Sequence, residues 1–398
     1  MRRSYENAAV IVSAVRTPIG KFGRTLKDYP APKLGALVIR EALNRARGIK
    51  ENDVSEVIMG NVVSAGLGQN PARQASIFAG LPVEIGGTTE NKVCGSGLKS
   101  IMLAAQAVRA GDSDCIIAGG MENMSRCPYL LKDQRWGLKF GDSKVLDSML
   151  LDGLWEVYND YHMGVTGEVV AKKHGVTRDE ADRFALDSYR KASRAISDGS
   201  FKQEIVPVEV KLPSGLVGKF EVDECVRSDA TLDGLKALKP VFKPTGILTA
   251  GNSSQLSDGA AAVVVTSEAK ARSRNQEILA RIVEYGQAGV KPEFVMEAPI
   301  PASKAVMRKA DLTINDIDLV EHNEAYSTAS IVVQRELGVP DSKFNVNGGA
   351  IALGHPIGCS GARLVATMIY SLKGRELHRG LVTLCLGGGE AVSMVLEV

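Results

Sequence analysis

The sequence lacks the patterns that mark several common classes of protein. Its six cysteines include no Cys-x-x-Cys pair and are spread over 398 residues, so neither a structural zinc site nor a disulfide framework is expected. No apolar run approaches the roughly 18 residues of a membrane span, so no membrane partner is expected. The G-x-S-x-G, G-x-G-x-x-G and G-x-x-x-x-G-K-[ST] motifs are absent, which excludes the hydrolase elbow, the dinucleotide-binding turn and the P-loop.

The sequence also lacks a large excess of positive or negative charge. The 48 Lys and Arg against 46 Asp and Glu give a net charge of +2, which argues against a nucleic-acid binder but leaves open a basic patch for a small anion. The apolar fraction of 44% and the charged fraction of 24% are typical of a folded protein, and the length predicts two or three domains. The 41 glycines predict many sharp turns or close approaches of the backbone to a ligand.

Neither end of the sequence resembles a targeting signal. Residues 1–7 include Glu6 and lead into an apolar stretch from Ala8 to Ala14, which is too short for a secretory signal and is expected to be a strand. The final Leu-Glu-Val differs from a peroxisomal signal. Together with unpaired cysteines, these features predict a cytoplasmic protein with reduced thiols.

Short β-branched runs alternate with amphipathic stretches, which indicates an α/β fold. Several runs are apolar at consecutive positions, as expected for strands that helices cover on both faces of a sheet. The clearest runs are residues 10–12, 57–59, 115–118, 263–265, 381–386 and 392–396.

Residues 124–256 differ from the rest and indicate an inserted region. They contain both tryptophans and few β-branched runs. Within them, Thr177 and Glu180 have capping-box spacing, an apolar face follows, and Gly199 ends the pattern, so a helix is predicted there.

Two distant segments share a weak internal similarity. Gly95-Ser96-Gly97 opens a predicted helix that is followed by a short strand and glycines at 115–120, and Cys359-Ser360-Gly361 opens another that is followed by a strand and glycines at 381–389. Few letters are shared, so chance is an alternative explanation. A true repeat would imply two similar halves packed face to face, with paired loops meeting at one site.

Cys94 lies in Asn-Lys-Val-Cys-Gly-Ser-Gly (91–97), directly before a predicted helix. The positive end of that helix and its free N–H groups would favour the thiolate over the thiol, which is what a nucleophilic cysteine needs. Taken alone, such a cysteine is more often a small buried apolar side chain.

Three further residues are candidates for chemistry. His355 lies among glycines and before a proline, which predicts a rigid turned loop over 347–358 that presents the ring to a cleft; a turn or capping histidine is the alternative. Cys385 precedes three glycines, starting at Gly387, whose N–H groups could face an oxyanion; a buried strand cysteine is the alternative. Asn323 follows an apolar run and could hold a ligand or water, or form a turn.

Taken together and in this order, these motifs resemble those of one known protein family. The order Asn-Lys-Val-Cys-Gly-Ser-Gly, Asn-Glu-Ala, Gly-Gly-Ala-Ile-Ala-Leu-Gly-His-Pro-Ile-Gly and Cys-Leu-Gly-Gly-Gly resembles the thiolase family, especially its biosynthetic acetyl-CoA acetyltransferases. Ser-Ala-Val-Arg-Thr-Pro (13–18), Ala-Gly-Asn (250–252) and Asp-Gly-Ala-Ala (258–261) extend the likeness over essentially the whole chain.

The resemblance implies a thiolase-like fold of duplicated α/β halves, with mixed sheets covered by helices, plus an inserted loop domain. The N-terminal half would comprise residues 1–123 and 257–276, and the C-terminal half residues 277–398. The insertion, residues 124–256, would bind coenzyme A. The family forms dimers and tetramers, so a homodimer or homotetramer is expected, with residues 125–142 as a possible tetramerising loop.

The resemblance also implies roles for the candidate residues. Cys94 would be the nucleophile that is acylated, with His355 taking its proton, and Cys385 would be the acid/base at the α-carbon of a second acetyl-CoA. His355 and a water held by Asn323 would stabilise the enolate oxygen. The N–H groups of Cys94 and Gly387 would stabilise the tetrahedral oxyanion.

Coenzyme A is expected as a substrate and product, with no tightly bound cofactor and no metal. The resemblance points to His162, Arg227 and Ser254 as its contacts, and an arginine suits a planar base or a phosphate. Each of the three alone would pass as an ordinary polar surface residue.

Some positions depart from the family pattern. Tyr326 replaces a usual Phe, Glu390-Ala391 replace Met-Gly, Cys359 replaces a common Ala, and a pocket Met expected near Val295 is shifted to Met296. These changes spare the catalytic positions but leave the acyl chain length and the direction of reaction open.

The expected activity is that of an acetyl-CoA C-acetyltransferase, which makes or cleaves acetoacetyl-CoA by a ping-pong reaction. A degradative 3-oxoacyl-CoA thiolase for longer or unusual chains is the alternative. A non-catalytic acyl-CoA-binding scaffold is a third interpretation, and the second candidate thiol argues against it.

Overall fold

A ten-stranded mixed sheet forms the centre of the molecule. The structure, a computed structural model, describes residues 8–211 and 215–398, so the expectation for residues 1–7 lies outside the described residues. The strands follow the order β14-β15-β16-β13-β1-β12-β5-β3-β4, with β2 paired to β12. They are β1 (Ala9–Arg16), β2 (Gly20–Lys21), β3 (Glu56–Gly60), β4 (Gly86–Glu90), β5 (Cys115–Asn123), β12 (Ser257–Ser267), β13 (Ala280–Gly289), β14 (Leu319–His322), β15 (Arg379–Leu386) and β16 (Glu390–Glu397).

The sheet consists of two topological repeats. The order β1-β12-β5-β3 in the first half matches β13-β16-β15-β14 in the second, and successive neighbours in both are antiparallel, antiparallel and parallel. The predicted duplication of an α/β half is therefore confirmed. The two halves do not keep separate sheets, because β1 and β13 pair at Val10 with Arg281 and at Ile11 with Ala280.

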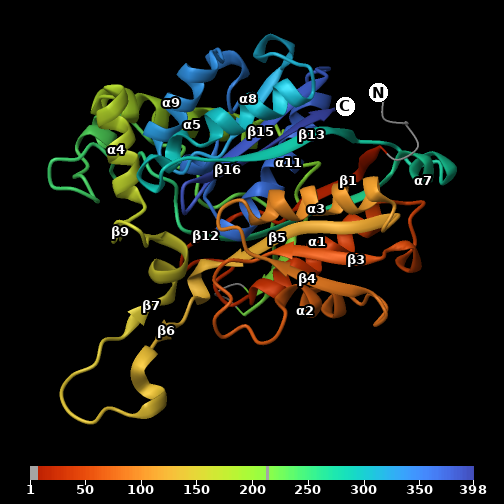
Figure 1. Cartoon of the computed structure of the whole chain (residues 1–398), viewed down its shortest axis with the longest axis horizontal. Coiled ribbons are helices and arrows are strands. Elements are labelled where there is room, and N and C mark those ends of the chain that lie inside the picture. Colours follow the sequence, from red (N-terminus) through yellow and green to blue (C-terminus); the bar gives the residue numbers. More distant parts are fainter. Residues whose placement is uncertain (1–7, 212–214) are drawn as a thin grey trace.

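Two equivalent helices lie between the halves. Helix α3 (Ser96–Ala110) precedes β5, α11 (Ile357–Lys373) precedes β15, and the two pack against each other (Figure 1). A Cβ atom on Gly97 would lie 2.8 Å from the backbone nitrogen of Ala362, and one on Gly361 would lie 2.3 Å from that of Leu98. The small residues predicted at both helix starts are thus required by the close crossing, although α11 begins at Ile357, before the expected Cys359.

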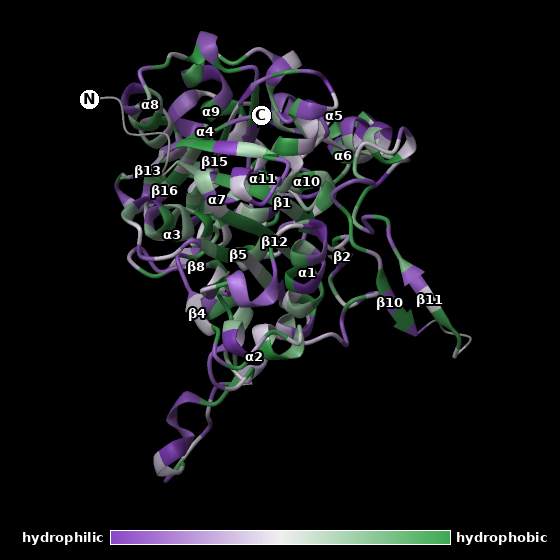
Figure 2. Ribbon diagram, turned by 90° about the vertical axis from the view of Figure 1, so that its right-hand side faces the viewer, coloured by the Kyte–Doolittle hydropathy of each residue, from purple (hydrophilic) through white to green (hydrophobic). Residues whose placement is uncertain are grey.

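Further helices cover the outer faces of the sheet. Helices α1 (Ala31–Arg45) and α2 (Pro71–Phe78) pack on the first half, and α8 (Pro299–Lys309) and α9 (Ser327–Leu337) pack on the second. Every residue of β5 is buried, as its continuous apolar run predicts, and Figure 2 shows β5 and β12 as hydrophobic strands within the molecule. The result is a layered molecule of helices, the first half of the sheet, the central helices, the second half of the sheet and further helices.

The region between β5 and β12 carries its own elements. They are β6 (Tyr129–Leu130), β7 (Leu146–Asp147), β8 (Trp155–Glu156), β9 (Tyr161–His162), α4 (Gly164–His174), α5 (Arg178–Ser197), β10 (Val208–Lys211), β11 (Val217–Phe220) and α6 (Leu232–Lys236). The remaining helices are α7 (Glu268–Ser273) and α10 (Ala350–Leu353), and short helical turns cover Glu51–Asp53, Met124–Arg126, Lys132–Trp136, Met149–Leu154, Pro292–Glu297, Ile314–Asp316 and Asp341–Lys343.

Helices α4 and α5 of the inserted region pack against elements of the second half, although the region is connected to strands of the first. Helix α5 has the predicted capping box, in which the Glu180 carboxylate accepts a hydrogen bond from the Thr177 N–H at 2.9 Å. Helices α4 and α5 contact α9, and α5 also contacts α10. The insertion therefore brings its side chains to the ends of β14 and β15.

None of the helices in the described ranges is long and apolar enough to cross a membrane. Within residues 8–211 and 215–398, no group of three or more His, Cys, Asp or Glu side chains is arranged to hold a metal ion.

Candidate active site

Cys94 lies in a strained turn just before α3. Val93 has a φ of +46°, a left-handed conformation that is unusual for a β-branched residue. The turn is held by side chains: Asn91 Oδ1 accepts from the Val93 N–H at 3.0 Å, and Ser96 Oγ donates to the Val93 carbonyl at 2.6 Å. Such strain is typical of functional sites, where the surrounding structure enforces it.

The turn at Cys94 packs against the glycine loop of the other half. The backbone N–H groups of Gly387 and of Cys94 itself lie near the Cys94 sulfur, where both act to lower its pKa. A Cβ atom on Gly95 would lie 1.9 Å from Leu386 Cδ2, so any larger residue here would require the Leu386 side chain to move. The structure thus brings together two predicted site residues from opposite ends of the chain.

The protonation state of Cys94 differs from the sequence-based expectation. Its side chain is partly accessible, yet burial in the surrounding protein raises its pKa to about 12, and the N–H groups of Gly387 and Cys94 only partly offset this. The expected preference for the thiolate is therefore wrong. Desolvation of a charged sulfur outweighs the N–H groups around it, so Cys94 needs a base.

Cys385, at the end of β15, is the second thiol of the site. Burial raises its pKa, and the charge that Cys94 would carry as a thiolate raises it further, so the two sulfurs interact. The Cys385 thiol points at Met296 Sδ, 3.7 Å away. Met296, the pocket Met that is shifted from the position near Val295, thus contacts one of the predicted catalytic groups.

His355 faces Asn323 across the site. Its Nδ1 lies 2.6 Å from Ser360 Oγ, whose own hydrogen is donated to the Pro356 carbonyl at 3.0 Å. Nδ1 therefore carries the imidazole proton, and the unprotonated Nε2 lies 3.4 Å from Asn323 Nδ2. Burial lowers the pKa of His355 to about 3, so the ring is neutral and Nε2 can accept a proton.

Residues 347–358 were expected to form a loop around His355. The structure shows that only part of this segment is a loop. Ala350–Leu353 form the short helix α10, and Ile357 starts α11, so His355 occupies the turn between two helices. Apolar burial of α10 against α5 stabilises this helical turn, which glycine and proline spacing alone does not reveal.

Asn323 follows the last residue of β14 and is fully buried. Its N–H donates to the Thr383 carbonyl at 3.1 Å, which ties it to the strand that carries Cys385. Its Oδ1 has no hydrogen-bond partner among the described residues. A buried acceptor of this kind is suited to bind a ligand or a water.

Sequence reasoning missed Glu122, at the end of β5. Its buried carboxylate accepts hydrogen bonds from the N–H groups of Val62 at 3.0 Å and Gly358 at 2.9 Å, and from Asn61 Nδ2 at 2.9 Å. Glu122 thus connects the first half to the start of α11, three residues after His355. No local pattern signals this role, because its partners come from distant segments.

A pocket of about 380 Å³ opens beside this cluster and contains the residues expected to bind coenzyme A. His162, Arg227 and Ser254 line it together with His355 and Tyr326. The pocket lining does not include Cys94, Cys385, Asn323 or Gly387. Tyr326 connects the pocket to the two thiols: burial raises the pKa of Tyr326 most, and the charges that Cys94 and Cys385 would carry raise it further.

The walls of this pocket combine aromatic rings with cationic groups. The His162 ring stacks on Phe242 with centroids 4.7 Å apart, and Phe242 meets Tyr326 edge to face. Lys21 and Arg227 supply positive charge. Lys21 was not predicted, and only its place next to the Arg-Thr-Pro motif could have drawn attention to it. The ring surfaces suit a planar base or an acyl chain, and the cations suit phosphate.

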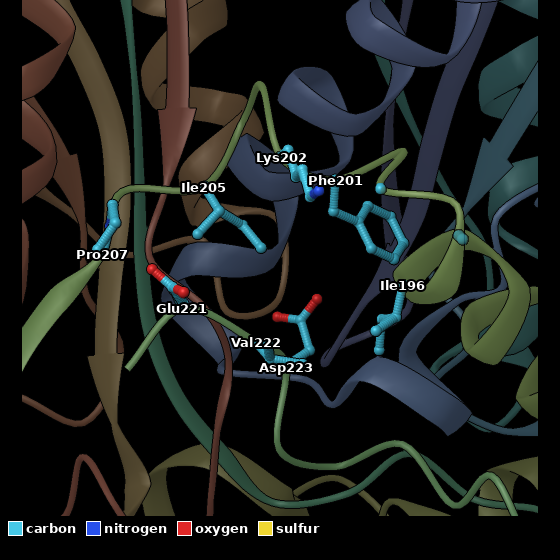
Figure 3. A pocket seen from close by; sticks show the side chains of 10 residues that line it. Ile196, Phe201, Lys202, Ile205, Pro207, Glu221, Val222 and Asp223 are labelled. Carbon is cyan, nitrogen blue, oxygen red and sulfur yellow. The ribbon is translucent and has the colours of Figure 1, made fainter. Parts of the chain in front are cut away.

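A second cavity lies away from the thiols. It has a volume of about 250 Å³, and Figure 3 shows Ile196, Phe201 and Asp223 around it. Asp223 already accepts hydrogen bonds from Arg16 at 2.6 Å and from the Ile19 N–H at 2.8 Å. None of the predicted site residues lines this cavity.

Known proteins resemble this chain over nearly its full length. It is 52% identical to an acetyl-CoA acetyltransferase of Cupriavidus necator over 388 residues, covering 98% of each chain. It is 47% identical to a probable acetyl-CoA acyltransferase of Staphylococcus epidermidis, again over 98% of each. The crystal structure of the Bacillus anthracis acetyl-CoA acetyltransferase superimposes with a TM-score of 0.95 at 40% identity, covering 98% of both chains.

Two family models cover the chain. The N-terminal thiolase domain matches residues 9–269 and the C-terminal thiolase domain matches residues 276–398. Since these matches agree with the duplicated fold and with the two thiols that it brings together, the chain belongs to the thiolase family.

Proposed function

We propose that this chain is an acetyl-CoA C-acetyltransferase, which joins two acetyl-CoA molecules into acetoacetyl-CoA and coenzyme A or catalyses the reverse thiolysis. The observation that carries the proposal is that two interacting thiols, Cys94 and Cys385, occur in one site with a neutral imidazole whose Nε2 is unprotonated. The names of relatives about 50% identical over nearly the whole chain support the same activity.

The first half-reaction transfers an acetyl group to Cys94. The Cys94 sulfur attacks the thioester carbon of acetyl-CoA while His355 Nε2 takes the thiol proton. The N–H groups of Cys94 and Gly387 hold the resulting oxyanion. The C–S bond to coenzyme A then breaks, and Cys385 gives its proton to the departing thiolate.

The second half-reaction forms the carbon-carbon bond. The Cys385 thiolate left by the first step removes a proton from the methyl carbon of a second acetyl-CoA. His355 Nε2 now carries a proton and donates to the enolate oxygen, next to a water bound at Asn323 Oδ1. The carbanion attacks the acetyl group on Cys94, and Cys94 regains its proton from His355, so every proton is accounted for.

Coenzyme A would occupy the pocket of about 380 Å³ as a substrate, without a tightly bound cofactor. Arg227 and Lys21 are placed to neutralise its phosphates, His162 and Phe242 to contact its pantetheine arm or base, and Ser254 to contact its amide groups. The Ser254 N–H donates to the Ala325 carbonyl at 2.9 Å, which holds this contact near Tyr326.

Incubation with acetyl-CoA followed by intact-mass measurement tests the activity. The protein should gain one acetyl group that is absent from Cys94→Ser. A chain that binds coenzyme A but never becomes acetylated would instead be the non-catalytic scaffold. Thiolysis of acetoacetyl-CoA compared with a longer 3-oxoacyl-CoA then separates the acetyltransferase from a degradative thiolase.

We further propose a homo-oligomer, a dimer or tetramer, with the β6–β7 hairpin as one contact. The hairpin projects from the body of the molecule (Figure 1), and Trp136 and Phe140 on it are 87% and 101% exposed. Large exposed aromatic residues on a projecting segment are typical of an interface with a second copy of the chain.

The division into halves 1–123 with 257–276 and 277–398, with an inserted domain at 124–256, is also proposed. It is supported by β5 ending at Asn123 and β12 starting at Ser257. A cytoplasmic location is supported by the six cysteines, all of which are free.

A further inference from the structure

The proposed oxyanion hole is assembled from two separate loops. One donor, the Cys94 N–H, belongs to the turn before α3 in the first half, and the other, the Gly387 N–H, belongs to the turn between β15 and β16 in the second. Donors act on an oxyanion only within about 2.7 to 3.1 Å, so the relative position of the two loops decides whether the hole works.

The loop that carries Gly387 is rich in glycine, and the Val290 N–H just after β13 donates to its Gly389 carbonyl at 2.7 Å. Gly388 and Gly389 have φ values of +94° and +90°, and a third glycine precedes them, so the backbone has little intrinsic preference for the conformation it adopts. The loop is closed by the pairing of Leu386 with Glu390 at the start of β16. Any contact that anchors Glu390 therefore also restrains Gly387.

An ion pair makes this anchor. Lys92 Nζ lies 2.6 Å from Glu390 Oε2, which connects the turn of Cys94 to the loop of Gly387. The backbone of Lys92 is itself fixed, because its N–H donates to Ser96 Oγ at 2.9 Å and its carbonyl accepts from the Gly95 N–H at 3.1 Å. On the other side, Glu390 pairs with Gly289 of β13 as well as with Leu386.

The surroundings of the pair are consistent with a role in geometry. The Lys92 side chain is 18% exposed and that of Glu390 is 43% exposed, so the pair is accessible to salt and contributes little to overall stability. Neither residue lines the pocket of about 380 Å³. Both ends are nevertheless attached to backbone that carries an oxyanion donor.

We propose that Lys92 and Glu390 are positioning residues whose ion pair holds the two oxyanion donors, the N–H groups of Cys94 and Gly387, at their working separation. The inference rests on the proposed function, which assigns those two groups to the oxyanion. Since neither residue lines the pocket proposed for coenzyme A, the pair should affect the rate of the chemical steps and not the binding of substrate. The usual Met of the family at position 390 could not make this contact.

A charge-swap experiment tests the inference. Lys92→Glu and Glu390→Lys each place like charges in contact, and each should lower kcat for acetoacetyl-CoA thiolysis about fivefold to tenfold, with KM changed less than twofold. The double variant K92E/E390K restores opposite charges and should recover at least half of the wild-type kcat. Such recovery is the signature of a direct pair, because independent effects would multiply.

A matched control lies on the same strand. Glu397, at the other end of β16, forms a comparably exposed ion pair with Arg379 at 3.1 Å. Glu397→Lys makes the same change of charge and should leave kcat within twofold of the wild type. Rates of Cys94 acetylation measured by rapid quench should follow kcat in every variant.

The outcomes separate the inference from the proposed function. If the wild type is never acetylated, the proposed function fails. Three results with an acetylated wild type would overturn the positioning role and show that the ion pair is merely a surface contact. They are an unchanged kcat in the single variants, a rise in KM as large as the fall in kcat, or a double variant in which the two losses of kcat multiply.

Discussion

The Gly387 N–H lies near the Cys94 sulfur and acts to lower its pKa, so the proposed nucleophile of one half of the molecule meets a loop of the other. This contact exists because α3 and α11 cross at glycines and bring the ends of the two halves together. The catalytic steps proposed above all occur around this contact, and five predictions follow the groups that surround it.

Cys385→Ala should still accept an acetyl group on Cys94 but lose condensation by a factor of about 10² to 10⁴, the usual contribution of an acid/base group. Acetylation survives because coenzyme A leaves as a stable thiolate even without a proton donor. Intact mass and acetoacetyl-CoA formation measure the two steps. Cys115→Ala, which removes a buried thiol from the start of β5, is the control. Normal condensation by Cys385→Ala would contradict the assignment of the base.

Asn323→Ala should reduce condensation by about 10² or more while acetylation of Cys94 is nearly unchanged. The reason is that Asn323 Oδ1 is a buried acceptor next to His355 with no partner in residues 8–211 and 215–398, so it can hold the water that faces the enolate. Exchange of the methyl protons of acetyl-CoA in D₂O reports enolate formation directly. Equal losses in acetylation and exchange would show that Asn323 acts on the whole site and not on the enolate.

Alkylation of free Cys94 by iodoacetamide should become faster with rising pH, without a plateau between pH 6 and 9. Burial raises the pKa of Cys94 to about 12 and lowers that of His355 to about 3, so no thiolate-imidazolium pair forms at neutral pH. The thiolate fraction then rises about tenfold for each pH unit. Peptide mass spectrometry measures the rate, and a plateau below pH 8 would contradict the prediction.

Glu122→Gln should change how stability depends on pH. Burial raises the pKa of Glu122 from its ordinary value to about 7, so the folded protein keeps a proton there that the unfolded chain has lost above about pH 4.5. The stabilisation of the folded state by this retained proton is fully present below about pH 4.5 and is lost as the pH rises through about 7. Between pH 4.5 and 8, the free energy of unfolding measured with urea should fall by up to about 3 kcal/mol more for the wild type than for Glu122→Gln. Parallel curves would contradict this.

Removing the aromatic side chains of the β6–β7 hairpin should lower the oligomeric state. Trp136→Ser with Phe140→Ser deletes its most exposed apolar groups, so light scattering should detect a smaller assembly while acetylation of Cys94 continues. Val217→Ser, an exposed apolar residue on β11, is the control for a nonspecific effect. An unchanged mass would place the interface elsewhere.

Much of the architecture was predictable because it depends on short-range patterns. Consecutive apolar residues predicted β5 and β12, the Thr177 and Glu180 pair predicted the start of α5, and the repeated Ser-Gly starts predicted that α3 and α11 are equivalent. These signals are local, since strand burial and helix capping involve residues within a few positions of one another. The resemblance then supplied the candidate site residues.

The sequence by itself determined which groups the site contains: two thiols, an imidazole, an amide and glycine N–H donors. Only the tertiary structure decided how they behave, because burial and contacts between distant segments depend on how the halves pack. The high pKa of Cys94, the sulfur contact of Met296, the anchor at Glu122 and the pair of Lys92 with Glu390 all arise in this way. Desolvation is a property of the folded surroundings, which no short stretch of sequence contains.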